Sequence, residues 1–496
     1  MPDAELNRSA GHDDLIFELG FAFFNDLYSR FYASTMHGQG PGMHLKILIN
    51  VTLHKIIIPC KNIEVRILII GSGSKEHALV WKFLSSEKFS DPEIYVCPGN
   101  FALRKIVDCI DADINDINRL LEIAIARNID LTIIGESELY SKGIVDAFNK
   151  ANKLILGPTK AAAELESSNF FAKNFMIKHG IPSPKCTLFE DINIANAFLP
   201  TLKYPVKIRP DKVFNAENPS TIVYDLEQAK LTAEELLRPT FFVKDTPRMI
   251  IEEILEGHQI TINTLADGNK ALSFPPVQAY RESDDYGHLA DRGAFAPTAV
   301  LSDELMAKVR FEIIDPTMEA LQDEGREYSG MLCFDIVLDK NDNNKPKLIQ
   351  YRTNLLDSDS QVTLPLLDEE IYEILSSAAR KDLGFYKDGF HKFVGSALAV
   401  NVVSSDKTED YITSIHSMEL LENINHELEN YQTALSGIPL MFYGTKMLKQ
   451  NYAEVFGATA VAETLVDAQI LAYKLADSLQ LPSKTYDRNI GDHGLI

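Results

Sequence analysis

Short apolar runs alternate with amphipathic stretches along most of this 496-residue chain. The run VRILII at 65–70 is apolar but for one arginine and rich in β-branched residues, which predicts a buried parallel strand. Gly71 and Gly73 follow it, and a helix pattern begins at Lys75. A glycine turn between strand and helix directs free backbone N–H groups and a positive dipole end at an anion. The segment therefore predicts either a phosphate site or a packing turn that binds nothing.

The alternation of strand, glycine turn and helix continues after this segment. Strands that end in glycine turns are predicted at 93–100 and 153–159, and a helix followed by a strand at 120–137. This order predicts a doubly wound parallel sheet whose ligands lie at the carboxyl ends of the strands. The spacing G-x-G-x-x-E puts Glu76 where a dinucleotide-binding fold has its third glycine, which argues against a nicotinamide site.

The later part of the chain predicts a different arrangement of helices and strands. A helix at 161–178 places Asn169 and Lys173 on one face, because they are four residues apart. The residues from 186 to 250 have the pattern of a small α+β module. Further elements are predicted as strands at 204–208, 248–255, 260–265 and 271–274, a helix at 303–325, a hairpin of 331–339 with 347–352, strands at 397–403 and 439–443, and a helix at 467–478.

Composition sets limits on the partners and the compartment. Hydrophobic content of 45% with 24% charged residues is ordinary for a soluble globular protein, and the length suggests about three or four domains. The net charge of −23 argues against nucleic acid or an anionic membrane as a partner. The five cysteines are scattered without metal-binding spacing, which suits a reducing cytoplasm. No apolar run reaches the length of a membrane span.

Several motifs resemble the glycinamide ribonucleotide synthetases, also called phosphoribosylamine–glycine ligases, which are ATP-grasp enzymes of purine synthesis. The motifs are GSGSKEHALVWK, CPGN, IDLTIIG, LGPTKAAAELESS and the closing YDRNIG. The resemblance runs from residue 65 to the end of the chain and implies an α/β fold in four parts. These are an extension at 1–62, a phosphoribosyl-binding domain at 63–165, an ATP-grasp domain at 166–390 with a small lid at about 186–250, and a C-terminal α+β domain at 391–496.

The resemblance also implies cofactors and substrates. The family uses ATP and magnesium to join glycine to phosphoribosylamine through a glycyl phosphate, and we expect a cytoplasmic monomer or homodimer. Its adenine-binding hinge strand corresponds to 251–255, so the implied contacts are Glu252, Glu253 and Leu255. Lys207 corresponds to a phosphate-binding lysine of the lid. Lys173 lies one turn after Asn169, which stands where the family has a second lysine.

The substrate and metal residues are implied in the same way. The N-terminal turn corresponds to the phosphoribosyl site, and Arg281 and Arg292 offer a bidentate grip on a phosphate or carboxylate as the catalytic candidates. The family's magnesium ligands Glu-x-Asn correspond to Gln350 and Arg352, so a displaced metal site would use Asp335, Gln350 and Asp357. The implied substrate-binding residues are Gly71, Gly73, Ser74, Lys75 and Glu76.

These departures from the family leave two hypotheses open. The first is a ligase whose altered site impairs its activity. The second is a non-catalytic ATP-grasp homologue, a pseudoenzyme that binds a nucleotide, a phosphoribosyl ligand or a protein partner. Asn169, Gln350 and Arg352 favour the second hypothesis, as does a lid loop after Lys207 that contains no glycine, whereas the N-terminal turn, Lys207 and Glu252 favour the first.

Overall fold

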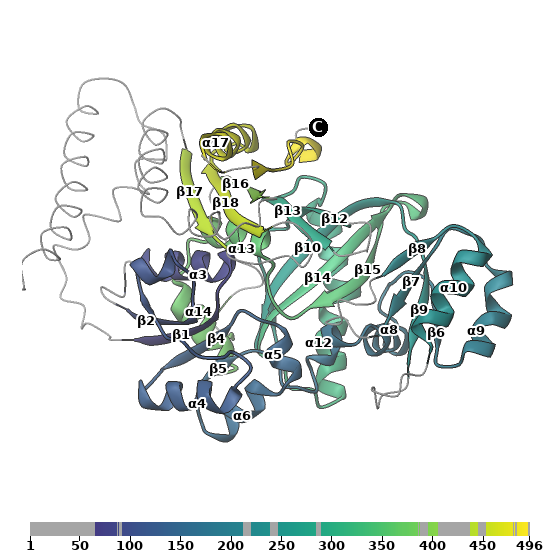
Figure 1. Ribbon diagram of the computed structural model, residues 1–496, viewed down its shortest axis with the longest axis horizontal. Helices are drawn as coiled ribbons and strands as arrows, with labels where there is room; N and C mark the ends of the chain where they lie inside the picture. The colour runs from purple at the N-terminus through teal and green to yellow at the C-terminus, as the bar shows by residue number, and fades with distance from the viewer. Residues whose placement is uncertain are drawn as a thin grey trace, which may run out of the picture. The chain divides into compact units, whose positions relative to one another are not determined.

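Strand β1 (Arg66–Gly71) lies in the middle of the N-terminal sheet of this computed structural model. The strand order is β3-β2-β1-β4-β5, and every neighbouring pair is parallel. Residues 67–70 are fully buried beneath helices on both sides of the sheet (Figure 1). The predicted doubly wound parallel sheet is confirmed. Its other elements are β2 (Glu93–Pro98), β3 (Asp108–Cys109), β4 (Leu131–Ile134), β5 (Ile155–Leu156), α3 (Ser74–Leu84), α4 (Ile117–Ala126), α5 (Glu138–Ser141) and α6 (Ile144–Lys150).

The chain divides into two units, residues 1–61 and 62–496. The first unit, which contains nearly all of the predicted N-terminal extension, lies outside the described residues. The structure describes residues 65–494 apart from 87, 89–91, 212–219, 239–246, 284–288, 385, 387–394, 405–436, 445–452, 480 and 482–483.

The second sheet is antiparallel and has the order β11-β10-β14-β15. The expected helix at 161–178 is interrupted at Ser168, whose extended backbone and hydroxyl cap the start of α8 (Asn169–Lys178). The expected helix at 303–325 is continuous but contains a π-helical segment, Arg310–Ile314. The elements of this part are β10 (Gly257–Ala266), β11 (Ala271–Ser273), β14 (Gly330–Asp339), β15 (Lys345–Arg352), α7 (Glu164–Ser167), α11 (Asp303–Val309) and α12 (Asp315–Asp323).

A small lid projects beside this sheet, at the right of Figure 1. Its antiparallel sheet has the order β6-β9-β7-β8 and packs under two short helices. Antiparallel pairing sets Lys207 of β7 opposite Glu252 of β9. The lid elements are β6 (Cys186–Phe189), α9 (Ile192–Phe198), β7 (Val206–Pro210), β8 (Thr221–Val223), α10 (Leu226–Leu236) and β9 (Met249–Glu253).

A third sheet joins two distant parts of the sequence. Strands β12 and β13 lie in the chain between β11 and β14 of the second sheet, yet β13 pairs with β16 of the C-terminal segment. Helix α13 (Asp357–Thr363) is buried and packs against β13 and β16 of this sheet and against α3, so it connects the third sheet with the N-terminal part of the fold. The remaining elements are β12 (Gln278–Ser283), β13 (Leu289–Ala296), β16 (Ser396–Ser404), β17 (Gly437–Tyr443), β18 (Ala453–Ala462), β19 (Lys484–Thr485), α14 (Ile371–Ala379) and α17 (Leu465–Ser478).

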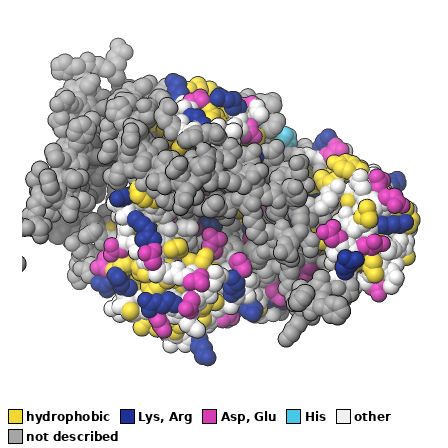
Figure 2. All heavy atoms as spheres, in the orientation of Figure 1, with side chains coloured by type: hydrophobic (Ala, Val, Ile, Leu, Met, Phe, Trp, Pro, Cys, Tyr) yellow, Lys and Arg dark blue, Asp and Glu magenta, His cyan; other side chains and the backbone are white. Residues whose placement is uncertain are grey.

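The described surface carries charges of both signs. In Figure 2 the basic and acidic side chains intermix over the lid and over the N-terminal helices. Among the described residues, no helix combines the length and apolar character needed to cross a lipid bilayer. Buried ion pairs of the molecule's interior lie on the lid strands, on α8 and in the second sheet.

Candidate nucleotide and substrate site

Lys173 and Glu252 form a buried ion pair between the lid and helix α8. Lys173 Nζ lies 3.0 Å from Glu252 Oε2 and donates to the carbonyl oxygen of Ile349 at 3.0 Å. Burial, reinforced by Arg209, lowers the pKa of Lys173 despite the neighbouring carboxylate. Burial opposes ionisation of Glu252, but Lys173, Arg209 and Lys207 outweigh it and hold the pKa of that carboxyl below its usual value. The predicted Lys173 and Glu252 are therefore brought together.

Arg209 is a central residue of the site that the sequence analysis missed. It lies on β7 two residues after Lys207, hence on the same face of the strand. Its Nη2 donates to Asn169 Oδ1 at 2.8 Å and to Gln350 Oε1 at 3.0 Å, and its Nη1 lies 3.4 Å from Glu252 Oε1. A positive charge near Asn169 is thus supplied by the lid. The sequence contained one signal for Arg209, because its spacing of two residues from Lys207 places both side chains on the same face of a strand.

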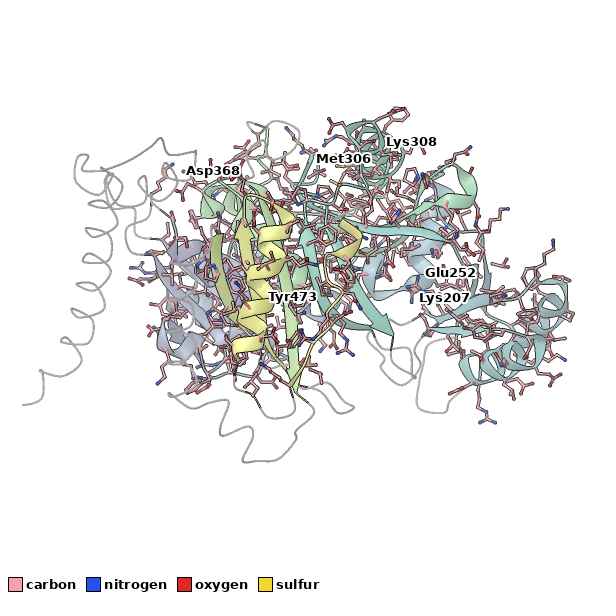
Figure 3. All side chains as sticks on the ribbon, turned by 90° about the horizontal axis from the view of Figure 1, so that it is seen from above. Lys207, Glu252, Met306, Lys308, Asp368 and Tyr473 are labelled. Atoms are coloured by element: carbon pink, nitrogen blue, oxygen red, sulfur yellow. The ribbon has the colours of Figure 1, made fainter. Side chains whose placement is uncertain are left out.

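The remaining predicted nucleotide contacts, which are Lys207, Glu253 and Leu255, are less involved in the ion pairs of the site. Figure 3 labels Lys207 and Glu252 side by side on the lid, as their register requires. Burial and the neighbouring Arg209 lower the pKa of Lys207 to about 8. Glu253 Oε1 accepts a hydrogen bond from the backbone N–H of Lys185 at 2.9 Å, and Leu255 follows β9 half-buried.

Arg352 and Asp335 make a bidentate ion pair inside the second sheet. Arg352 Nε donates to Asp335 Oδ2 at 3.0 Å, and Nη2 donates to Oδ1 at 2.9 Å and to Asp359 Oδ2 at 2.9 Å. Burial opposes the charge on Asp335, but Arg352 and Arg281 hold the pKa of its carboxyl well below the usual range. Arg352 occupies the strand end where the resemblance implies a magnesium ligand, and it faces the carboxylate there.

Arg281, a predicted catalytic residue, belongs to the same cluster. Its Nη1 donates to Asp335 Oδ1 at 3.2 Å and its Nη2 to Asp359 Oδ1 at 3.3 Å. Arg292 is the extra residue of a β-bulge, because Tyr280 lies opposite Gly293 and Arg281 opposite Asp291. Arg281 therefore reaches the buried carboxylates.

The donor set at Asp335 does not fit a magnesium ion. Besides the two arginines, Asp335 accepts from Thr261 Oγ1 at 2.8 Å and from Gln350 Nε2 at 2.8 Å. A carboxylate offers about four lone-pair directions, so these donors leave none for a metal. Asp357 does not share this environment, since its Oδ1 accepts from the backbone N–H of Lys75 at 3.0 Å. Within the described residues, no group of three His, Cys, Asp or Glu side chains is placed to hold a metal ion.

The N-terminal turn has carboxylates against its backbone donors. Glu76 Oε2 accepts from the N–H of Gly73 at 2.6 Å, and Asp357 occupies the N–H of Lys75. Ser74 Oγ accepts a hydrogen bond from Gln361 Nε2 at 2.9 Å. A side chain at position 71 would collide with Glu76, because a Cβ atom added to Gly71 would lie 2.6 Å from Glu76 Cδ. Burial raises the pKa of Glu76 to about 7 although Lys75 opposes the shift. The predicted substrate residues are gathered at one turn, but protein groups already use two of its amides.

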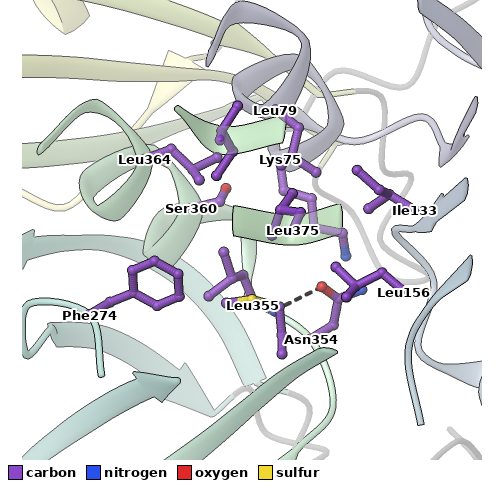
Figure 4. A pocket seen from close by; sticks show the side chains of 12 residues that line it. Lys75, Leu79, Ile133, Leu156, Phe274, Asn354, Leu355, Ser360, Leu364 and Leu375 are labelled. Carbon is purple, nitrogen blue, oxygen red and sulfur yellow. Dashed lines mark hydrogen bonds between the residues drawn. The ribbon is translucent and has the colours of Figure 1, made fainter. Parts of the chain in front are cut away.

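Two cavities adjoin these clusters. One, of about 110 Å³, lies between α8 and β15 and is lined by Asn169, Lys173, Gln350, Arg352 and the carboxylate-bearing Glu166, together with apolar neighbours. The other is a narrow space of about 30 Å³ near Lys75 that is otherwise mainly apolar (Figure 4). The lining of the first cavity carries two cations, Lys173 and Arg352, and one carboxylate, Glu166, so its positive charges outnumber its negative charge, which suits an anionic ligand.

Comparison with known proteins identifies the family. The phosphoribosylglycinamide synthetase N-domain model matches residues 65–166, and the ATP-grasp (A) domain model of the same synthetase matches residues 167–360. The chain belongs to the phosphoribosylglycinamide synthetase family. The resemblance noted in the sequence is confirmed, and the synthetase assignment covers both the parallel sheet and the lid-bearing part of the fold.

Relatives and solved structures agree with this family. The phosphoribosylamine–glycine ligase of Pasteurella multocida is 29% identical over 433 residues, which are 86% of this chain and 97% of that protein. The corresponding ligase of Chlorobaculum tepidum is 28% identical over 441 residues, 87% of this chain and all of the relative. A crystal structure of the Thermotoga maritima ligase superposes with a TM-score of 0.66 at 21% identity, covering 86% of this chain and 100% of that one.

The same fold recurs in an ATP-grasp structure determined with nucleotide. A carboxyaminoimidazole ribonucleotide synthase from Aspergillus clavatus, crystallised with ATP, has a TM-score of 0.58 at 11% identity over 84% of this chain and 99% of that one. At that identity the likeness concerns the fold alone. Members of the phosphoribosylglycinamide synthetase family share this ATP-grasp architecture, and the described lid and second sheet of this chain form it.

Proposed function

We propose that this chain is an ATP-dependent ligase that joins glycine to phosphoribosylamine. The observation that supports this most is the convergence of Lys173, Lys207 and Glu252 where the lid meets α8. These are the positions at which the family resemblance implies nucleotide contacts. Lys173 lines the cavity of about 110 Å³ and pairs with Glu252, and Lys207 lies opposite Glu252 on the lid. The ATP-grasp (A) domain match, residues 167–360, contains all three of these residues.

The chemistry assigns a role to each group. A carboxylate accepts an amine only after phosphorylation turns one of its oxygens into a leaving group, and phosphoryl transfer develops charge on the phosphate oxygens. Lys173, Lys207 and Arg209 supply positive charge to those oxygens in a buried setting, where each interaction is stronger than in water. A divalent cation supplies the same neutralisation in related chemistry. Because Asp335 and Gln350 do not fit such an ion, no step is assigned to it here.

A second function is favoured by one observation. The bidentate pair of Arg352 with Asp335 stands where the family resemblance implies a metal, and losing a catalytic metal ordinarily lowers turnover by orders of magnitude. The alternative is a non-catalytic homologue that binds nucleotide or a phosphoribosyl ligand. We expect the ligase to be slow for the same reason.

One assay separates the two functions. The purified chain is incubated with ATP, glycine and phosphoribosylamine, and glycinamide ribonucleotide and ADP are measured by mass spectrometry. We expect slow formation of both products in equal amounts, abolished by Lys207→Ala and retained by Lys203→Ala, a change at an exposed lysine four residues away. ADP without the amide product would overturn the ligase proposal, and no turnover by a folded chain that binds ATP would support the non-catalytic function.

A further inference from the structure

A connected set of buried charges runs from the lid strands β7 and β9 into the second sheet. We call the buried network the seven side chains of Lys173, Arg209, Glu252, Arg281, Asp335, Arg352 and Asp359. Ion pairs join Lys173 and Arg209 to Glu252, and join both of the other arginines to Asp335 and Asp359. Gln350 bridges the two halves, since it accepts from Arg209 and donates to Asp335.

The charges within this network are not balanced. Four of its members are cations and three are carboxylates. The one excess positive charge lies in the half that contains Lys173 and Arg209, because the other half has two of each sign and Asp291 is a further carboxylate near Arg281. Each of the seven side chains is 7% exposed or less. A buried positive charge is costly unless an anion compensates it. This local excess of positive charge contrasts with the net charge of −23 on the whole chain.

Unused donors accompany the excess charge. Arg352 Nη1 and Arg209 Nε are buried and make no hydrogen bond within the part of the chain that the structure describes. Arg352 also lines the cavity of about 110 Å³, together with Lys173. Buried guanidinium N–H groups normally find an acceptor. A cavity several times larger than the roughly 10–15 Å³ that a water needs has room for one.

We propose that the terminal phosphates of a nucleoside triphosphate are this acceptor, and that the protein binds the nucleotide without a divalent cation. The guanidinium of Arg352 and the ammonium of Lys173 neutralise phosphate oxygens by charge-assisted hydrogen bonds. Asp335, whose lone pairs are already used by Arg352, Arg281, Thr261 and Gln350, holds Arg352 in position. This inference rests on the proposed function because it concerns the same nucleotide site.

Titration calorimetry with ATP tests the inference on the unaltered protein. Binding is measured once with excess EDTA and once with excess Mg²⁺. We expect ATP in EDTA to bind at least as tightly as Mg-ATP, because free ATP carries more negative charge toward an excess of protein cations. Binding that disappears in EDTA and returns with Mg²⁺ overturns the inference and leaves the ligase proposal standing. A folded chain that binds ATP under neither condition overturns both.

Two variants locate the effect. Lys173→Met is expected to weaken ATP binding in EDTA by about tenfold or more, whereas Lys178→Met, at an exposed position on the same helix, changes it by less than about twofold. The double variant Gln350→Glu with Arg352→Asn removes a cation and adds a carboxylate, so its ATP binding is expected to become Mg²⁺-dependent. Equal effects of the two lysine variants would contradict the proposed site, and circular dichroism checks that each variant is folded.

Discussion

Arg209 Nη2 and Gln350 Oε1 lie 3.0 Å apart, and this hydrogen bond joins a lid strand to a strand of the second sheet. The same guanidinium contacts the main-chain oxygen of Ile349 at 3.4 Å. The lid therefore contacts the core through polar groups, of which Gln350 also lines the cavity of about 110 Å³. A ligand that takes up these donors competes with the contact between lid and core.

Loss of Arg209 is expected to loosen the lid. Arg209→Ala leaves Glu252 with Lys173 as its remaining buried ion-pair partner, so the loss is that of a charged hydrogen bond, about 1.5–3 kcal/mol. Hydrogen–deuterium exchange should accelerate in β7 and β9 more than in the N-terminal sheet. Lys203→Ala is the matched control, and unchanged exchange in β7 would contradict the role assigned to Arg209.

The pair of Arg352 with Asp335 is expected to stabilise the fold strongly. Arg352→Ala leaves Asp335 and Asp359 as buried carboxylates that only Arg281 still pairs, so we expect a loss of about 3–5 kcal/mol in the free energy of unfolding. Urea denaturation measures this loss. The exposed pair of Lys381 with Glu327 provides the comparison, and Lys381→Ala should cost about 1 kcal/mol or less.

Glu76 should make stability decrease as the pH rises from its usual pKa of 4.5 to about 7. Burial raises its pKa in the folded state, so in this window the native chain binds more protons than the unfolded chain. The contribution is fully present below 4.5 and is lost as the pH passes about 7. Glu76→Gln removes it, and thermal unfolding across this range should then depend less on pH. An unchanged slope in the variant would show that other groups cause the dependence.

Lys207 should take up a proton when an anion binds. Burial lowers its pKa to about 8, so it is partly deprotonated at that pH, and a nearby phosphate favours the charged form. Calorimetry of ATP binding at about pH 8 in two buffers with different ionisation enthalpies measures the uptake. We expect up to about half a proton, and none for Lys207→Met. Equal proton uptake by the unaltered protein and by Lys207→Met would show that a group other than Lys207 takes up the proton.

The sequence predicted the parts of the fold that depend on local pattern. The apolar run at 65–70, the glycine turn after it and the strands at 204–208 and 331–339 all form elements, because burial of an apolar face fixes them. The prediction of one continuous helix at 161–178 was wrong at Ser168, because the preference of serine for the helix N-cap outweighed the helical pattern there.

The site was predicted less well because its contacts join distant parts of the chain. Arg209 and Gln350 are 141 residues apart, and no periodicity specifies such a pair. Arg352 was noted as a cation at an implied metal position, but its pairing with Asp335 depends on the register of β14 and β15. The metal prediction for Asp335, Gln350 and Asp357 assumed that these groups are available. Asp335 and Gln350 bond to each other, and Asp357 bonds to the N-terminal turn.

A crystal structure of the chain with bound ATP tests the central claim most directly. The account predicts phosphate oxygens within hydrogen-bonding distance of Arg352 and Lys173, with the pair of Arg352 and Asp335 intact and no metal between them. A divalent ion held between the phosphates and Asp335, with Arg352 turned away, would contradict it.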